Sequence, residues 1–330
     1  MFELLSFSLL FFVGLVTIIS DNRLVLKVLY VPSLLFFMII VRYSGFDEDI
    51  LSYIIEMKYW SSEWYYLKEF IFWYAIRLLY YIFNSDVLVL LLMDMIWISL
   101  LIKTSFNLSN TVNINNRLGT GLIVILATSF PFFLGYQNVY RQLIATVLAL
   151  FSYSLLHISY KRSILFFIMS IFVHNTAIIL APIFFIKRIM NFKINARIFM
   201  SLMIAVLFIY FIVFTDSVIN HKSAYSTKTD NTLVYLSMYI FLFVIYLVRF
   251  KFNFYVLARK VPSLIIILIL MVGLINLDFD MIAERMGMMF LVFLLFDLYK
   301  YSISINNYYY RISYRLCLLI LFTTPVLISS

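Results

Sequence analysis

The sequence predicts an all-α fold, a polytopic bundle of membrane-spanning helices. Of its 330 residues, 65% are hydrophobic and only 12% are charged, whereas soluble domains are about 45–50% apolar and about 25% charged. Its 35 Phe and 25 Tyr lie in long runs that are almost free of charge, with more apolar surface than a core of this size could bury. Because lipid offers the backbone no hydrogen bonds and no strand-like alternation recurs, each run is expected to be an α-helix.

The apolar runs give the expected order of helices. A helix needs about 20 apolar residues to cross a bilayer, or a few less where its polar ends reach the head groups. The first run, 2–19, has no basic segment before it and is expected to be a retained helix, not a cleavable signal peptide. Further spans are expected at 24–41, 70–83, 87–102, 118–134, 142–159, 163–186, 198–214, 233–248, 261–277, 286–299 and 316–328. Together they predict about ten to twelve crossings in a single membrane domain, 1–330.

The charged residues predict which side of the membrane each connection faces. The net charge of +9 comes from short clusters of Lys and Arg between the runs, which are typical of cytoplasmic loops and not of a nucleic-acid-binding surface. The clusters expected in the cytoplasm are Arg23/Lys27, Lys103/Arg117, Lys161/Arg162, Lys187/Arg188/Lys193/Arg197, Arg249/Lys251/Arg259/Lys260 and Lys300/Arg311/Arg315. The segment 42–69 carries six acids against three bases and is rich in Tyr and Trp. It is expected on the outer side, as are 135–141, 215–232 and 278–285.

If every apolar run crossed the membrane once, the loops could not all lie on the sides that their charges predict. Two runs are therefore expected to be re-entrant or interfacial. The run 70–83 is short and carries Arg77. The run 163–186 is interrupted by His174-Asn175-Thr176, which suits two half-helices that meet at a polar turn. In the alternative arrangement both runs cross once, and the clusters at 103–117 and 161–162 lie outside.

An ionisable residue inside a span is expected to have a partner or a function, because its insertion into the membrane costs about 2.5–3.5 kcal/mol at the centre of a helix. Such residues are Arg77, Asp94, Arg141, His157, His174, Glu284, Arg285 and Asp297. Asp94 is expected to join two helices, by a hydrogen bond or an ion pair. His157 and Asp297 lie near the cytoplasmic ends of their runs and are assigned no function.

The polar segment before the run 142–159 is the first candidate site. Gly135, Asn138, Arg141 and Gln142 lie there at the mouth of two apolar helices. The planar, permanently charged guanidinium of Arg141 suits phosphate oxygens. The alternative is an interfacial arginine that reaches lipid head groups.

Two further pairs of polar residues are candidates. His174 and Asn175, in the middle of an apolar run, are either a helix-packing pair or an acid–base group and a hydrogen-bond donor that face a cavity. Glu284 and Arg285, at the entrance of a later run, are either a local cap and charge pair or part of a site.

The acidic and aromatic segment 42–69 is a third candidate region. It includes Asp47, Asp49, Tyr53 and Trp64. Its rings offer flat apolar faces for sugars, next to carboxylates that accept hydrogen bonds from sugar hydroxyls. An aromatic belt at the level of the head groups explains the rings equally well but not the acids.

Signatures of soluble enzymes are absent from the sequence. With only 7 Gly it has no glycine-rich phosphate loop, and it has no HExxH, no paired cysteine and no G-x-S-x-G. No cofactor and no metal ion are therefore expected. The energy for any reaction would come from the substrate itself or from a gradient.

Three parts of the sequence together resemble a known family. They are a central block with Tyr140-Arg141-Gln142-Leu143-Ile144-Ala145, Lys161-Arg162, Phe172-Val173-His174-Asn175-Thr176 and Pro182; an early part with Gly45-Phe46-Asp47, Asp49, Tyr53 and Glu69-Phe70; and the late Arg285. This pattern resembles the EpsG/Wzy family of bacterial polysaccharide polymerases. In that family an Arg-Gln at the outer start of one helix is followed, some thirty residues later, by a His, a small polar step and an apolar run that ends in Pro.

The resemblance implies a glycosyltransferase of the bacterial inner membrane that extends O-antigen, capsule or exopolysaccharide chains, as in lipopolysaccharide biosynthesis. At the periplasmic face, a hydroxyl of one repeat unit would attack the anomeric carbon of the growing chain, and undecaprenyl diphosphate would leave. The implied partners are undecaprenyl-diphosphate-linked oligosaccharide, membrane lipid and a chain-length-regulating co-polymerase, without nucleic acid.

The resemblance also implies roles for the candidate residues. Arg141 and Arg285 would stabilise charge on the diphosphate. The proton acceptor would be one of four residues, which the sequence does not rank: His174, Asp47, Asp49 or Glu69. The residues expected to bind substrate are Gln142, Asn138, Asn175, Glu284, Asp49, Tyr53 and Trp64.

Three other functions stay open at this point. A lipid-linked oligosaccharide flippase or secondary transporter predicts internal symmetry between two halves, which the sequence does not show. An O-antigen ligase-type transferase would move a finished chain to another acceptor. A membrane acyltransferase would modify the glycan and leave its length unchanged.

Overall fold

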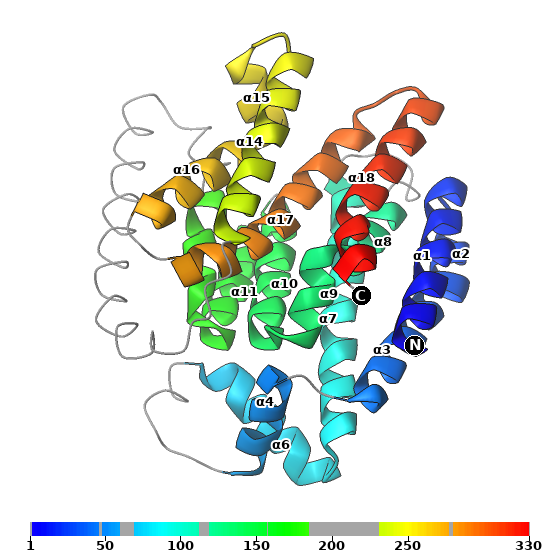
Figure 1. Cartoon of the computed structure of the whole chain (residues 1–330), viewed down its shortest axis with the longest axis vertical. Coiled ribbons are helices and arrows are strands. Elements are labelled where there is room, and N and C mark those ends of the chain that lie inside the picture. Colours follow the sequence, from blue (N-terminus) through cyan, green and yellow to red (C-terminus); the bar gives the residue numbers. More distant parts are fainter. Residues whose placement is uncertain are drawn as a thin grey trace. The chain divides into compact units, whose positions relative to one another are not determined.

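A computed structural model of the chain describes residues 2–45, 48–59, 69–111, 119–156, 158–184, 231–276 and 280–329. All secondary structure in these residues is helical, which confirms the all-α prediction. The chain divides into two compact units, Met1–Ala177 with Leu298–Ser330 and Ile178–Asp297 (Figure 1). The single membrane domain expected from the sequence stays a prediction.

The larger unit contains most of the helices. In chain order it has α1 (Phe2–Ser20), α2 (Arg23–Val25), the π-helical turn η1 (Leu26–Tyr30), α3 (Val31–Ser44), α4 (Glu48–Lys58), α6 (Phe70–Phe83), α7 (Asp86–Thr111), α8 (Thr120–Thr128), α9 (Phe130–Gln137), α10 (Tyr140–Leu155), α11 (Tyr160–Val173) and α18 (Tyr308–Ser329). The smaller unit has α14 (Asn231–Arg249), α15 (Phe254–Lys260) and α16 (Pro262–Asn276). The 3-10 helix η2 (Asn175–Leu180) and α17 (Asp280–Ile303) contribute residues to both.

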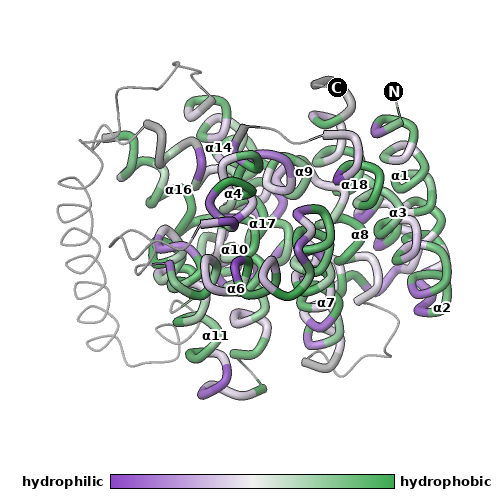
Figure 2. Tube along the Cα trace, turned by 90° about the horizontal axis from the view of Figure 1, so that it is seen from below, coloured by the Kyte–Doolittle hydropathy of each residue, from purple (hydrophilic) through white to green (hydrophobic). Residues whose placement is uncertain are grey.

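Several helices are long and apolar enough to cross a membrane, so this is a multi-pass membrane protein. In the described residues there are five such helices, or up to seven if the bent pairs α8–α9 and α15–α16 each form one span. Hydrophobic residues dominate α1 along most of its length (Figure 2). Large apolar side chains such as Phe12 are exposed on its surface, which is expected where lipid is the solvent.

The described part of the chain contains fewer spans than the ten to twelve expected, and three of the expected runs illustrate the difference. The run 70–83 forms α6, whose 14 residues reach only about 21 Å across a hydrocarbon core of about 30 Å. The run 163–186 is interrupted, as expected, because α11 ends at Val173 and η2 begins at Asn175. The run 198–214 lies outside the described residues.

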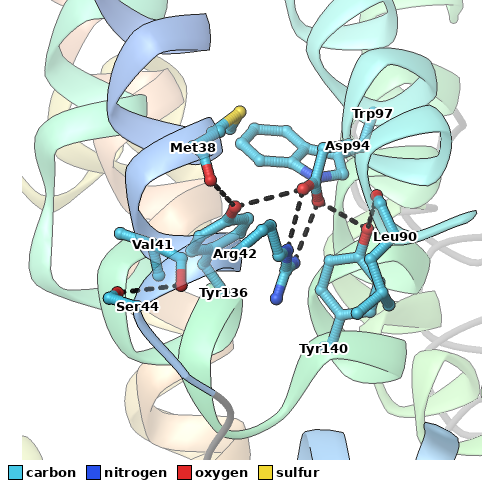
Figure 3. A network of polar contacts seen from close by, with 9 residues as sticks. All are labelled: Met38, Val41, Arg42, Ser44, Leu90, Asp94, Trp97, Tyr136 and Tyr140. Atoms are coloured by element: carbon cyan, nitrogen blue, oxygen red, sulfur yellow. Dashed lines mark hydrogen bonds and ion pairs between the residues drawn. The ribbon is translucent and has the colours of Figure 1, made fainter. Parts of the chain in front are cut away.

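The short helices α4 and α6 pack together at one end of the larger unit. In Figures 1 and 2 they lie beneath the ends of α10 and α11, and α6 packs against both α7 and α11. The expected outer segment 42–69 is thus partly helical. Its first residue, Arg42, belongs instead to the last turn of α3 and is buried. A buried arginine needs a partner, and Arg42 pairs with Asp94 of α7 at 3.0 Å, which confirms the expected ion pair for Asp94 (Figure 3).

A second buried ion pair helps to join α1, α8 and α18 at the opposite end of α1. Glu3 at the start of α1 accepts a hydrogen bond from Ser44 at the end of α3, whereas Asp21 follows the last residue of α1. Asp21 pairs with Arg315 of α18 at 3.3 Å and accepts from Thr120 of α8 at 2.9 Å. These contacts hold the ends of α1, α8 and α18 together.

Gly119, just before α8, lies too close to α7 to tolerate a side chain. A Cβ there would lie 2.4 Å from the backbone oxygen of Ser105 and 2.2 Å from Oγ of Ser109. We expect Gly119→Ala to lower the free energy of unfolding by about 1–3 kcal/mol, because the backbone of α7 must shift. Gly273→Ala in α16 is the matched control, since nothing lies within 4 Å of its added methyl group. Thermal melts of the detergent-solubilised variants would contradict this expectation if both behaved alike.

Candidate active site

A buried carboxylate, Glu69, links two basic side chains from distant parts of the sequence. Glu69 lies in the turn before α6, Arg141 in the first turn of α10, and His174 directly after α11. Arg141 Nη1 lies 2.5 Å from Oε2 of Glu69, and His174 Nδ1 forms a short contact with Oε1. The Arg141–Glu69–His174 cluster therefore brings together three of the residues that the sequence singled out as candidate catalytic residues.

The end of α11 explains how His174 reaches Glu69. His174 has extended backbone angles, φ −154° and ψ 121°, and its N–H still donates to the Ser170 carbonyl at 3.0 Å. The chain then turns into η2, and the backbone N–H of Asn175 donates to Oε1 of Glu69 at 3.3 Å. The interruption that the sequence predicted in this run thus supplies both a side chain and a backbone donor to the carboxylate.

Burial differs sharply between the members of the cluster. The side chain of Glu69 is 2% exposed, whereas Arg141 is 13% and His174 15% exposed. The anion is therefore buried beneath two basic groups that reach the surface. This arrangement can present a cation and an imidazole to a ligand while the carboxylate holds both in place.

Aromatic rings pack against the guanidinium of Arg141. Its Cζ lies 4.9 Å from the ring centre of Trp73, 5.1 Å from that of Tyr53 and 6.0 Å from that of Phe72. Tyr53 comes from α4 and the other two from α6. Such rings attract a cation, particularly where water is excluded. Trp73 and Phe72 are site residues that the sequence did not indicate, although Trp73 follows Glu69 by four residues, a spacing that places two residues on one side of a helix.

The neighbouring basic groups keep Glu69 ionised. Burial raises the pKa of its carboxyl, but the hydrogen bond and charge of His174 and the charge of Arg141 outweigh this effect and hold the pKa below its ordinary value of 4.5. An ionised carboxylate only accepts hydrogen bonds, so Nδ1 of His174 carries the proton. In the neutral imidazole, Nε2 is then an acceptor, which is the form a general base requires.

With this geometry established, the comparison with known proteins decides the family. A model of the EpsG family matches residues 5–330, essentially the whole chain. The chain belongs to the EpsG family. This confirms the resemblance and supports a role of the polysaccharide-polymerase type. No curated protein and no solved structure matches the chain significantly.

The other residues expected to bind substrate in this EpsG-family protein lie in different surroundings. Tyr53 is only 7% exposed and packs beneath Arg141, so it supports the guanidinium and offers little surface to a sugar. Gln142 is buried in α10, while Asn138, at the end of α9, and Asp49, in the first turn of α4, are partly exposed. Asp47 and Trp64 lie outside the described residues.

Two candidates belong to α17, in the part of the chain that forms the smaller unit. Arg285 is exposed there, and the side chain of Glu284 lies outside the described residues. Among the residues that the structure describes, no three His, Cys, Asp or Glu side chains are close enough to share a metal ion.

The lowered pKa of Glu69 predicts how stability depends on pH. A carboxyl whose pKa is lower in the folded than in the unfolded chain contributes stability that is fully present above its ordinary pKa of 4.5 and is lost as the pH falls through the folded value. We therefore expect wild type and Glu69→Gln to differ most in melting temperature near neutral pH and to converge in acid. Melts of both proteins from about pH 7 to about pH 3 measure this difference. A difference that stayed constant over this range would contradict the ion pairs.

Proposed function

We propose that this EpsG-family protein is a glycosyltransferase that joins undecaprenyl-diphosphate-linked oligosaccharide repeat units into a polysaccharide, at the periplasmic face of the inner membrane. The observation that carries the proposal is the Arg141–Glu69–His174 cluster. It combines a cation suited to a diphosphate with an imidazole oriented by a carboxylate, at the ends of apolar helices. A lipid-linked sugar presents both its diphosphate and its sugar at the membrane surface, where the ends of such helices lie.

The reaction needs a group that stabilises the leaving diphosphate. As the anomeric carbon bonds to the attacking hydroxyl oxygen, its bond to the diphosphate oxygen breaks and negative charge develops on that oxygen. The guanidinium of Arg141, held over Trp73 and against Glu69, is placed to stabilise this charge. The role of Arg285, which is exposed in the smaller unit, stays a prediction.

The attacking hydroxyl also needs a proton acceptor. Among the candidates His174 is favoured, because Nδ1 faces Glu69 and Nε2 is then the basic nitrogen. When Nε2 takes the proton, the imidazolium formed lies against the ionised carboxylate of Glu69, which stabilises it. Glu69 is thus proposed as the orienting carboxylate, while Asp47 and Asp49 stay secondary candidates for the base.

The larger unit by itself supports the proposed outer location. Glu69 belongs to the acidic segment 42–69. The first residue of α10, Tyr140, contacts Arg42 of α3. Arg42 lies two residues before Ser44, which binds Glu3 at the start of α1. Arg315, from one of the expected cytoplasmic clusters, pairs at the other end of α1. An expected cytoplasmic cluster at one end of α1 and the acidic segment at the other support a periplasmic location of the Arg141–Glu69–His174 cluster.

The test is to delete the gene, complement it with wild type or an empty vector, and separate the surface glycan by size. We expect a single repeat unit on the acceptor after deletion and a full ladder with wild type. An unchanged ladder would contradict the proposal, and altered acetyl content with unchanged length would indicate an acyltransferase. Complete loss of surface repeat units, including the single unit, would instead indicate a flippase or a ligase.

A further inference from the structure

A second polar network lies within the membrane helices next to the candidate active site (Figure 3). Its centre is Asp94 of α7, and we call it the Asp94 network: Arg42, Asp94, Trp97, Tyr136 and Tyr140. Arg42 binds both carboxylate oxygens of Asp94, through Nε and Nη2, at 3.0 Å each. Arg42 is 2% and Asp94 1% exposed, so this pair is closed to water.

Three further donors surround the same carboxylate. The indole N–H of Trp97 donates to Oδ1 at 3.1 Å, the hydroxyl of Tyr140 to Oδ1 at 2.6 Å and that of Tyr136 to Oδ2 at 3.1 Å. The rings of both tyrosines also lie against the guanidinium of Arg42, 3.9 and 4.7 Å from its Cζ. A buried ion pair is often no more stable than a well-packed apolar contact, so a network with this many donors is better explained by the geometry it imposes.

The two tyrosines fix the corner between α9 and α10. Tyr136 lies in the last turn of α9 and Tyr140 is the first residue of α10, with only Asn138 and Val139 between the two helices. Both hydroxyls donate to the carboxylate of Asp94 in α7, and the Tyr136 hydroxyl also lies 3.2 Å from the Met38 carbonyl oxygen of α3. The corner is therefore fastened to two neighbouring helices.

Tyr140 connects this network to Arg141. It directly precedes Arg141 in the chain, and its ring packs edge to face against Phe72 with centroids 6.5 Å apart. Phe72 is one of the rings that lie beneath the guanidinium of Arg141. Tyr136, four residues earlier in α9, packs instead on Phe37, Trp97 and Tyr140.

We infer that Asp94, held by Arg42, is a positioning residue for Arg141. Through the hydroxyl of Tyr140 it sets the first turn of α10, so that the guanidinium meets Glu69 and lies over Trp73. The inference rests on the proposed function for its catalytic consequence. A group that stabilises developing charge must be held closely, since a displacement of about 1 Å can reduce a rate by about a hundredfold.

The experiment compares Tyr140→Phe with Tyr136→Phe in the purified, full-length protein. Each removes one buried hydroxyl that donates to Asp94, so each should lower the melting temperature to a similar degree. With a purified undecaprenyl-diphosphate-linked repeat unit, we expect Tyr140→Phe to lower kcat about tenfold with little change in KM, and Tyr136→Phe to keep kcat near wild type. Equal kcat values, or losses that follow the melting temperature in both variants, would overturn the inference.

A second readout does not depend on activity. The chain has 3 His, so selective ¹⁵N labelling of histidine with a His174→Gln reference identifies the imidazole signals of His174. Tyr140→Phe should shift them, because Arg141 and His174 share Glu69, whereas Tyr136→Phe should not. An unshifted signal in Tyr140→Phe would overturn the inference. If wild type does not extend the repeat unit but the signal shifts, the proposed function fails while the positioning of Arg141 by Asp94 is supported.

Discussion

Glu69→Gln should abolish formation of the glycan ladder and lower the rate of chain extension by about a hundredfold to a thousandfold. The carboxylate is the shared partner of Arg141 and His174, and the neutral amide can neither attract the guanidinium by charge nor stabilise an imidazolium. Its NH₂ group would also face a guanidinium or an imidazole N–H, donor against donor. The measurement is the rate of extension of a purified lipid-linked repeat unit, together with the ladder in complemented cells.

The matched control is Asp86→Asn, which removes the acidic partner of an exposed ion pair in the same unit. Asp86 and Lys58 lie 3.0 Å apart, but their side chains are 27% and 40% exposed. Such pairs contribute about 0–1 kcal/mol, so this variant should keep both its stability and its activity. A normal ladder in Glu69→Gln would show that the cluster has no part in the reaction.

Much of the helical framework could be predicted from the sequence, since apolar runs of this length have few alternatives in lipid. What hydropathy could not show is which helix faces which. Arg42 was expected in an outer segment because it follows an apolar run, yet it is buried in α3 against Asp94. The partner of a buried charge depends on tertiary packing, and Asp94 lies 52 residues away in the chain.

The candidate site was predicted as separate residues and not as a site. Arg141, Glu69 and His174 were each singled out, but Glu69 is 72 residues from Arg141 and 105 from His174 in sequence. The sequence grouped Glu69 with the possible bases, whereas the structure places it between the two basic groups. Trp73 was missed because an aromatic residue in an apolar run is typical of any membrane helix.

Two of the arginine–carboxylate pairs of the larger unit differ in whether they reach the surface. Arg42 is 2% exposed and faces Asp94, which is also bound by tyrosine and indole donors. Arg141 is 13% exposed, and its carboxylate partner is also bound to an imidazole that reaches the surface. The first pair is suited to fixing helices, and the second to meeting a charged ligand.

Arg141→Lys tests this distinction most directly, and we expect it to lower the rate of chain extension by about a hundredfold. A lysine keeps the positive charge but loses the planar fork that binds a phosphate through two N–H groups and lies flat over Trp73 and Tyr53. The control is Arg162→Lys on the exposed first turn of α11, which should leave the rate unchanged. If Arg141→Lys retained most of the activity, Arg141 would act only as an interfacial charge that reaches lipid head groups, a role in which lysine serves equally well.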